Sequence, residues 1–367
     1  MEQRLIWAVK AAGIQPTGKK LAELSQRVDL FDDSAIDIKS KQYEEAVKNF
    51  ETAAKLGYSV VTYIDDLYPE CLRSISMPPP VLYVRGNARI LGDVVFAGIV
   101  GARDSDDYGN RTAQNIAMEI GQTGAGVVSG GARGIDAAAH NGALRANAPT
   151  VAVLGCGLDV VYPKSNKKLF DKIVQTGGAI ISEFPFGEPP LKTNFPRRNR
   201  IIAALSTAVL VVRAGKRSGS LITASQAMQM NKTVFAVPGN IDSRLSQGTN
   251  ELIRDGALVL LSSVDMIDEL ISKKPDFFVR EKSAQDAESW QHDEEEKIPE
   301  EKKLSADLSE YEREIVNIIN DGFNTQNLME EKVSFEVSRL VALLGMMEIK
   351  GIIKRGPDKK YTAENYD

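Results

Sequence analysis

The sequence predicts an α/β protein built on a doubly wound, mainly parallel sheet. Between Asp93 and Lys273, short β-branched runs alternate with longer amphipathic segments. The short runs are apolar throughout, which is typical of strands buried on both faces of a parallel sheet. Crossovers between parallel strands are right-handed, so helices should cover both faces of the sheet. Ligands of such sheets bind beyond the carboxyl ends of the strands, and we expect the functional residues in the turns there.

Strands and helices are expected to follow one another in a regular order in this region. The apolar runs predict strands at residues 94–100, 126–129, 151–154, 179–182, 208–212, 233–237 and 258–261. Amphipathic spacing predicts helices at residues 110–123, 134–146, 166–176, 199–205, 220–230, 250–255 and 265–271. Residues 86–273 are therefore predicted to form one core domain.

The segments on either side of this core differ from it in composition. Residues 1–85 are predicted to form a small helical domain, because apolar residues recur at helical spacing around Leu5 and Val47. A triple proline ends that pattern, and a short strand is expected at 81–84. Residues 274–303 are dense in acidic charge and almost free of aliphatic residues, so we expect a disordered acidic linker.

Residues 304–367 predict two helices followed by a basic two-stranded hairpin. This order is typical of a winged-helix-like domain. A plain helical protein-interaction domain is the alternative, because the second helix, at 335–347, is poor in Lys and Arg.

Bulk properties narrow the class of protein. A chain of 367 residues suits two or three domains, and 43% hydrophobic residues suffice for a sizeable core. The net charge of −5 argues against a general coat of positive charge, although binding of phosphate depends on where the cations lie. The two cysteines, Cys71 and Cys156, are far apart and are expected to be reduced. No apolar run approaches the ~20 residues of a membrane span, so a soluble, cytoplasmic protein is expected.

Glycine-rich turns follow the predicted strands. The first strand ends at Gly101, and Arg103 should project over the strand ends, where a phosphate would lie. The second ends at Gly130 and Gly131 ahead of a helix, where exposed backbone N–H groups and the positive helix end favour an anion. A helix end contributes only ~0.3–1 kcal/mol, so side chains must supply the rest. Lys164, after the third strand, is expected to reach a phosphate.

The most informative segment is 195–202, in which an aromatic ring and three arginines precede an apolar run. Cations at a helix N-terminus oppose the helix dipole and call for an anionic partner. A solvated helix start with internal salt bridges is the alternative. The residues predicted to contact nucleic acid are Arg103, Gly130, Gly131, Lys164, Lys192, Phe195, Arg197, Arg198, Asn199, Arg200, Lys216 and Arg217.

Reactive groups are not expected in these turns. Asp136 is predicted to cap its helix. His140 would be a general-base candidate in an enzyme, but it is predicted to be a packed residue of the helix. The sequence holds no P-loop pattern, no metal-ligand spacing and no paired carboxylates facing the glycine turns. We therefore predict no catalytic residues, no metal and no cofactor.

At this point the motifs resemble those of the DNA-processing protein A (DprA/Smf) family. The resemblance covers residues 68–270 and is carried by segments 98–103, 129–136, 155–164, 195–202, 218–224 and 237–239. It implies an extended Rossmann-like core that dimerises, with a SAM-like N-terminal domain and a winged-helix-like tail. It implies single-stranded DNA as ligand and a role in protecting incoming DNA and loading a RecA-type recombinase in natural transformation and recombination. Single-strand-binding protein is a further expected partner.

The family's nucleotide pocket maps onto Arg103, Lys192 and Phe195, with the Gly130–Gly131 turn close by, and Lys164 matches a further basic contact. Two residues depart from the family pattern. Arg213 stands where the family usually has Glu, which predicts a more basic groove rim, and Thr249 replaces a common Cys, which bears on the fold more than on DNA.

Two other functions stay open from the residues alone. Related folds with paired-glycine turns cleave nucleoside monophosphates, so a phosphoribohydrolase-type enzyme of nucleotide metabolism is the main alternative. A regulatory binder of duplex DNA acting through the tail domain is the other.

Overall fold

The computed structural model describes residues 4, 5, 7–9, 40–280 and 310–323, together with individual residues between 325 and 363. The chain divides into two compact units, residues 1–292 and 293–367, and each is described by itself. Within the described residues, every helix is too short or too polar to cross a bilayer.

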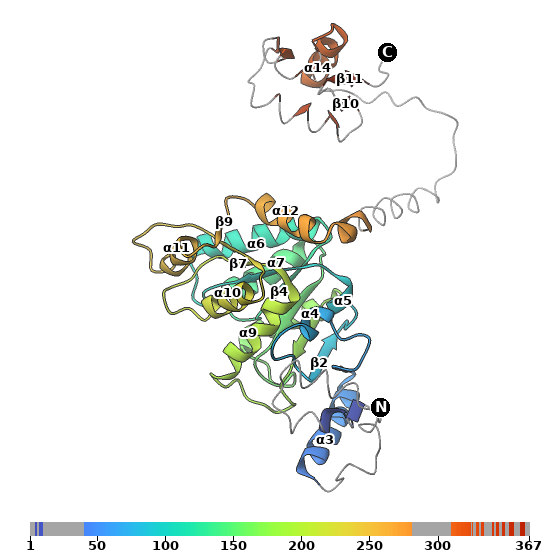
Figure 1. The fold of residues 1–367 in the computed structure, drawn as a ribbon, viewed down its shortest axis with the longest axis vertical. Coiled ribbons are helices and arrows are strands. Elements are labelled where there is room, and N and C mark those ends of the chain that lie inside the picture. The colour runs from blue at the N-terminus through green and yellow to red at the C-terminus, as the bar shows by residue number, and fades with distance from the viewer. Residues whose placement is uncertain are drawn as a thin grey trace, which may run out of the picture. The chain divides into compact units, whose positions relative to one another are not determined.

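A nine-stranded sheet forms the centre of the first unit among the described residues (Figure 1). Its strand order is β1-β2-β6-β5-β4-β3-β7-β8-β9. Strands β3 to β9 run parallel, whereas β2 is antiparallel to both β6 and β1. The strands are β1 (Ser59–Thr62), β2 (Val81–Gly86), β3 (Phe96–Val100), β4 (Gly126–Ser129), β5 (Thr150–Val153), β6 (Ala179–Ser182), β7 (Ser206–Val211), β8 (Thr233–Ala236) and β9 (Leu258–Val259). The doubly wound, mainly parallel sheet predicted from the sequence is confirmed.

The direction of winding changes at β3. From β3 the chain proceeds outward to β4, β5 and β6, and then crosses back to β7 on the other side of β3. In an open sheet of this kind, the loops that leave two neighbouring strands in opposite directions open a crevice at their carboxyl ends.

Helices fill the connections between the parallel strands. They are α6 (Asp107–Gln122), α7 (Ile135–Arg145), η3 (Lys164–Asn166), α8 (Lys167–Gln175), α9 (Asn194–Leu205), α10 (Ser220–Gln229) and α11 (Gln247–Arg254). Helix α12 (Ser263–Lys273) follows β9. Earlier in the chain lie α3 (Lys41–Leu56), α4 (Glu70–Arg73) and α5 (Ile90–Asp93).

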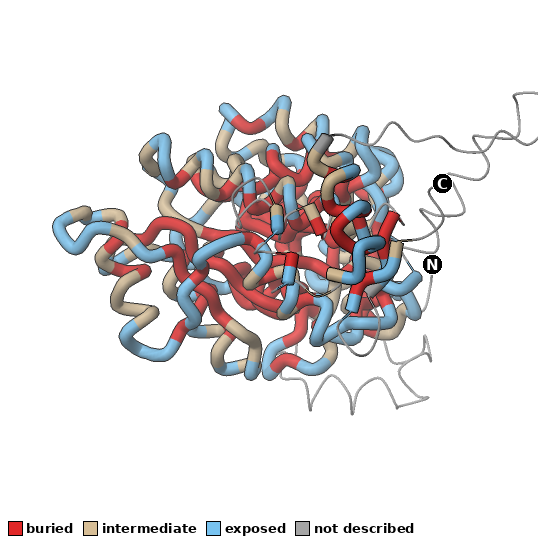
Figure 2. The backbone as a smooth tube through the Cα atoms, turned by 90° about the horizontal axis from the view of Figure 1, so that it is seen from above, coloured by how far each residue is buried: buried red, intermediate tan, exposed pale blue. Residues whose placement is uncertain are grey.

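Both faces of the sheet are covered, as β7 illustrates. Val209 and Val211 pack into one cluster together with residues of α9 and α10. Ala208 and Leu210 point the other way, into a cluster formed with α6, α7 and α12. Successive strand residues alternate between faces, so an unbroken apolar run is needed where both faces are buried. Figure 2 shows this buried backbone running through the middle of the unit, with exposed segments around it.

The sheet begins earlier than the core boundary predicted at residue 86. Strand β1 starts at Ser59, and β2 pairs with β6 through partners such as Tyr83 and Ser182, so part of the predicted helical region is sheet. Helix α3 does lie in that region, and Trp7 is buried there with its ring 5.6 Å from that of Tyr63. Residues 10–39 and the predicted linker at 281–303 lie outside the described residues, whereas 275–280 are helical.

The second unit contains α14 (Glu310–Asn320) and the antiparallel pair β10 (Ile353–Arg355) and β11 (Tyr361–Ala363). Ile315 of α14, Leu340, Leu344 and Tyr361 share one small core. A helix and a terminal hairpin agree with this part of the prediction, and the winged-helix-like assignment stays a prediction.

Candidate nucleic-acid interface

A cleft of about 840 Å³ lies at the carboxyl ends of the central strands, where the loops after β3, β4, β5, β6 and β7 meet. Arg103, Lys192 and Arg217 line it from three of these loops, and Phe195, Arg198 and Asn199 line it from α9. This is the crevice that the reversal at β3 produces. Half of the predicted contact residues therefore meet in one place, although the chain separates the first from the last by more than a hundred positions.

Phe195 is half-buried in the first turn of α9. The helix begins at Asn194, five residues before the predicted start, because Pro196 falls in the first turn, where a missing N–H costs nothing. The ring centroid lies 5.7 Å from that of Tyr162, and a side chain at Gly155 would touch the ring at 3.0 Å. Phe195 is thus held in position by its neighbours, as a stacking platform for a base needs to be.

Arg103 lies over this platform. Its guanidinium carbon is 4.7 Å from the centroid of the Phe195 ring, and the side chain is exposed to solvent. Aromatic rings and guanidinium planes both stack on nucleobases, and a guanidinium also binds phosphate. Lys192 and Arg217 are likewise exposed on the cleft wall. The site therefore combines one apolar ring with three accessible cations.

Arg198 lies beneath the cleft floor and is 5% exposed. Its Nη1 donates to the carbonyl oxygens of Gly130, at 2.6 Å, and Val153. Burial lowers the pKa of Arg198 to about 10, against the opposing effect of nearby Asp136, so the guanidinium keeps its charge at neutral pH. Arg198 thus contributes positive potential from below while its hydrogen bonds hold β4 and β5 together.

The paired glycines were predicted to expose their backbone N–H groups, but they do not. Gly130 and Gly131 are both buried. A side chain at Gly130 would meet Arg198 at 2.5 Å, and one at Gly131, where φ is +65°, would meet Phe170 at 2.9 Å. The glycines are needed because these side chains fill the space where a Cβ would lie. The next residue, Ala132, is the one that lines the cleft.

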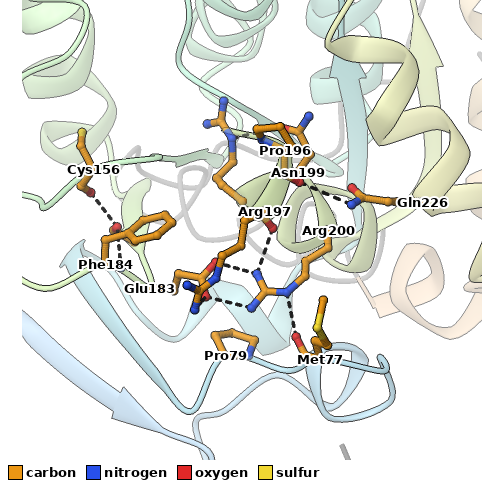
Figure 3. Close-up of polar contacts among 12 residues, drawn as sticks. Met77, Pro79, Cys156, Glu183, Phe184, Pro196, Arg197, Asn199, Arg200 and Gln226 are labelled. Carbon is orange, nitrogen blue, oxygen red and sulfur yellow. Dashed lines mark hydrogen bonds and ion pairs between the residues drawn. The ribbon is translucent and has the colours of Figure 1, made fainter. Parts of the chain in front are cut away.

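Arg200 and Arg197 point away from the cleft and converge on Glu183, which follows β6 (Figure 3). Arg200 Nη1 and Nη2 donate to the two carboxylate oxygens of Glu183 at 2.6 and 2.8 Å, and Nε donates to the carbonyl of Met77 at 2.8 Å. The Glu183 and Arg200 side chains are 1% and 5% exposed, whereas that of Arg197 is 51% exposed. The internal salt bridge weighed as an alternative is therefore present at Arg200, which joins α9 to β6 and to the segment before β2.

The remaining predicted contacts differ in their surroundings. Asn199 donates to the carbonyl of Gly219 at 3.1 Å and so connects α9 to the loop after β7. Lys216 is exposed and lies 3.5 Å from Glu251, outside the cleft lining. Lys164 is also exposed outside the lining, two residues after Tyr162, which lines the cleft. Direct contact of these side chains with nucleic acid stays a prediction.

Arg213 does not add free positive charge to the rim, contrary to expectation. It is 8% exposed and donates to both carboxylate oxygens of Asp106, at 3.0 and 3.2 Å, and to Ser246 Oγ at 2.6 Å. Desolvation of Asp106 is outweighed by its hydrogen bonds from Gly109 and Arg213, so the pKa of Asp106 falls below its usual value. Thr249 is buried and donates to the carbonyl of Ser246 at 3.1 Å, which is a role in the fold.

The candidate acid–base groups are buried. Asp136 lies in the first turn of α7, lines the cleft floor and accepts from the Ala132 N–H at 3.3 Å, and its burial raises its pKa. His140 is fully buried with Nδ1 2.7 Å from Thr150 Oγ1, and burial lowers its pKa to about 3. His140 is therefore a packed residue, as predicted, and its lowered pKa keeps it neutral at pH 7. Among the described residues, no three His, Cys, Asp or Glu side chains gather as metal ligands.

Tyr162 belongs to the cleft but is not among the predicted contact residues. Its ring lines the cleft and contacts that of Phe195. The hydroxyl-bearing Ser218 and Ser220 also line the cleft and lie 2.8 Å apart through their Oγ atoms. An aromatic residue in a loop that follows a parallel strand was the available signal for Tyr162.

Comparison with known proteins identifies the family. The sequence model of DNA recombination-mediator protein A matches residues 59–271, more than half of the chain. The chain belongs to the DNA recombination-mediator protein A family. The matched segment contains the whole nine-stranded sheet and every cleft residue named above.

Individual members of the family show the same similarity. Protein Smf from Synechocystis is 45% identical over 209 residues, which cover 56% of this chain and 52% of that protein, so the chain spans about half of its length. The crystal structure of DNA processing protein A from Streptococcus pneumoniae is 34% identical, with a TM-score of 0.62, and covers 73% of this chain and 98% of that one. DNA processing protein A from Helicobacter pylori, described for its single-stranded DNA binding mode, is 33% identical with a TM-score of 0.53. The match covers 59% of this chain and 96% of that one.

Proposed function

We propose that this protein binds single-stranded DNA in the cleft and helps to load a RecA-type recombinase onto it in natural transformation and homologous recombination. The bound strand is protected and not chemically changed. The observation that carries the proposal is the stack of Arg103 on Phe195, with Lys192 and Arg217 lining the same cleft.

The chemistry of the cleft suits an unpaired strand. A base stacks on Phe195 or on the guanidinium plane of Arg103, and the flanking cations bind phosphates. Stacking accepts any base, so binding is expected to be independent of sequence. A duplex keeps its bases stacked on one another, so it cannot offer one to the ring. The relative from Helicobacter pylori, described for binding single-stranded DNA, supports this choice of ligand.

A homodimer through the core is part of the proposal. β9 is the last strand of the sheet, and the side chains of Leu258 and Val259 are 51% and 39% exposed, with Leu261 next to them 83% exposed. An apolar sheet edge of this kind supports pairing with a second copy. Two clefts in one particle bind a long strand more tightly than one.

Fluorescence anisotropy with single-stranded and duplex oligonucleotides of the same length tests DNA binding. We expect the single strand to bind more tightly and the affinity to fall as salt rises. Equal affinity for single-stranded and duplex DNA, both in the full chain and in a chain that ends at residue 303, would refute the cleft as a single-strand site. Preference for duplex that disappears with the tail would support the tail-domain alternative.

Recombinase loading is tested separately. The protein is added to RecA-type recombinase and DNA precoated with single-strand-binding protein, and filament formation is followed by ATP hydrolysis of the recombinase. A shorter lag with the full chain is expected. An unchanged lag would leave a DNA binder without the mediator role.

The phosphoribohydrolase alternative has one observation in its favour. Such an enzyme needs a carboxylate beside the glycine turn, and Asp136 lines the cleft floor there. Its position next to buried Arg198 favours a structural role instead. Incubation with a panel of nucleoside monophosphates decides between them, since release of free base that is lost in Asp136→Asn would establish the enzyme.

A further inference from the structure

Helix α8 presents a row of lysines that begins beside the cleft. Lys164 of η3 and Lys168 and Lys172 of α8 follow one another at intervals of four residues, and all three are exposed. Side chains four apart share one face of a helix, and one such step rises about 6 Å along the axis. The opposite face buries Phe170 and Ile173. These three residues are called the α8 lysine row below.

The start of the row is fixed to the cleft. Asn166 is buried, and its Nδ2 donates to the carbonyl oxygens of Gly131 and Ala132, both at 3.0 Å. Ala132 and Tyr162 both line the cleft. A strand that leaves the cleft past Tyr162 therefore meets Lys164 first.

The positive charge of the row is not neutralised by the protein. Asp171 is the one acidic residue of α8, and it binds Lys167 at 2.8 Å and Arg85 of β2 at 2.5 Å. Hydrogen bonds from Lys167 and Arg85 lower the pKa of Asp171, so it stays ionised and committed to them. Within the described part of the chain, Lys164, Lys168 and Lys172 form no ion pair.

The neighbouring helix α7 adds to the excess of positive charge. α7 packs beside α8, buries its one acid, Asp136, and ends at exposed Arg145. Residues 132–178 contain six Lys and Arg but three Asp, in a chain whose net charge is −5. Such a local cluster creates a positive potential that the average charge conceals.

The position of the lysines in the helix also calls for an anion. The first turn of α8 contains Lys167 and Lys168 and no acidic residue. Cations at a helix N-terminus are unfavourable, because the N-terminal end of the helix dipole is itself positive. A phosphate bound there interacts favourably with both the lysines and the helix end.

We propose that a single strand longer than the cleft continues along the α8 lysine row, with successive phosphates at Lys164, Lys168 and Lys172. The inference rests on the proposed function, because it needs a strand bound in the cleft. It assigns Lys168 and Lys172 as contacts that extend the footprint of the cleft. The spacing along the helix is close to that of neighbouring phosphates in an extended strand, which favours a polynucleotide over an isolated anion.

The test compares two oligothymidylates, one of about 6 nucleotides, within the ~4–16 covered by a single binding fold, and one of about 30. Wild-type protein and Lys168→Gln/Lys172→Gln are titrated with each at several salt concentrations. We expect equal affinity for the short strand, but a smaller gain in affinity with length in the variant. For the long strand, the log–log salt slope should decrease by about 0.7 for each of the two phosphates that the variant no longer binds.

The matched control is Lys48→Gln/Lys55→Gln, which removes two exposed lysines from α3. It should keep the wild-type gain with length. A variant of Lys168 and Lys172 that also keeps the gain and the slope would overturn the α8 lysine row alone. Wild-type protein that binds neither strand would instead refute the proposed function.

Discussion

The guanidinium of Arg103 lies 4.7 Å from the centre of the Phe195 ring, although the two residues belong to the loop after β3 and to α9. Arg198 also approaches the ring, at 5.9 Å, but it is buried, so Arg103 is the cation of this pair that solvent reaches. Under the proposed function, a nucleotide in the cleft would meet a stacking group and a phosphate ligand side by side.

Phe195→Ala should weaken binding of single-stranded DNA. Loss of one base stack of ~1–3 kcal/mol corresponds to roughly a 5- to 150-fold higher Kd. The log–log salt slope should not change, because no charge is removed. Phe195→Trp is the control that keeps the stack and should bind within a few-fold of wild type. Full affinity of Phe195→Ala would show that no base uses this ring.

Arg103→Ala and Lys192→Ala should each flatten the salt dependence of binding. Removing the cation that binds one phosphate lowers the log–log slope for a single strand by about 0.7. Titrations between low and moderate salt measure the slope directly. Lys273→Ala, which removes an exposed lysine of α12, should leave it unchanged. If the slopes of the two cleft variants equal that of wild type, these residues do not bind phosphate.

Glu183→Gln should destabilise the fold. The substitution leaves the buried guanidinium of Arg200 without its carboxylate, and breaking a buried pair in this way costs about 3–5 kcal/mol. Urea unfolding of the full chain measures the change. Glu251→Gln removes the partner of exposed Lys216 and should cost at most about 1 kcal/mol. Similar losses in the two variants would contradict the structural role of Arg200.

His140 should make stability depend on pH in the acidic range. Its folded-state pKa of about 3 lies below the ordinary value of 6.5, so between these values the unfolded chain binds a proton that the folded chain does not. The contribution of His140 to the free energy of unfolding is complete above pH 6.5. It decreases as the pH falls and is about 2 kcal/mol smaller at pH 5. Free energies of unfolding at pH 7 and pH 5 should therefore differ by about 2 kcal/mol less in His140→Gln than in wild type. Equal differences in the two proteins would show that His140 protonates in the fold.

The sequence was sufficient to predict the parallel part of the sheet, because each core strand is an unbroken apolar run of recognisable length. It did not show that β1 belongs to the sheet. Ser59–Thr62 has only four residues, and the residue pattern of so short a stretch does not distinguish a strand from a loop. What places it is pairing with β2, which in turn pairs with β6 almost a hundred residues later.

The cleft was predictable to the extent that its residues follow strand ends. Arg103, Lys192, Phe195 and Arg217 meet there because parallel strands bring their carboxyl ends to one edge. The direction of each arginine on α9 was not predictable. Arg198 is buried where it binds Gly130 and Val153, and Arg200 is buried where it binds Glu183 and the carbonyl of Met77, which lies more than a hundred residues earlier.

The antiparallel pairing of β2 with β6 has a practical consequence for dissecting this molecule. A shortened version that starts at residue 86 would lose both outer strands and leave the Ala179–Ser182 edge with unmet hydrogen bonds. Such a fragment would tend to self-associate whatever its affinity for DNA. Deletion mapping of the amino-terminal portion should therefore cut upstream of Ser59.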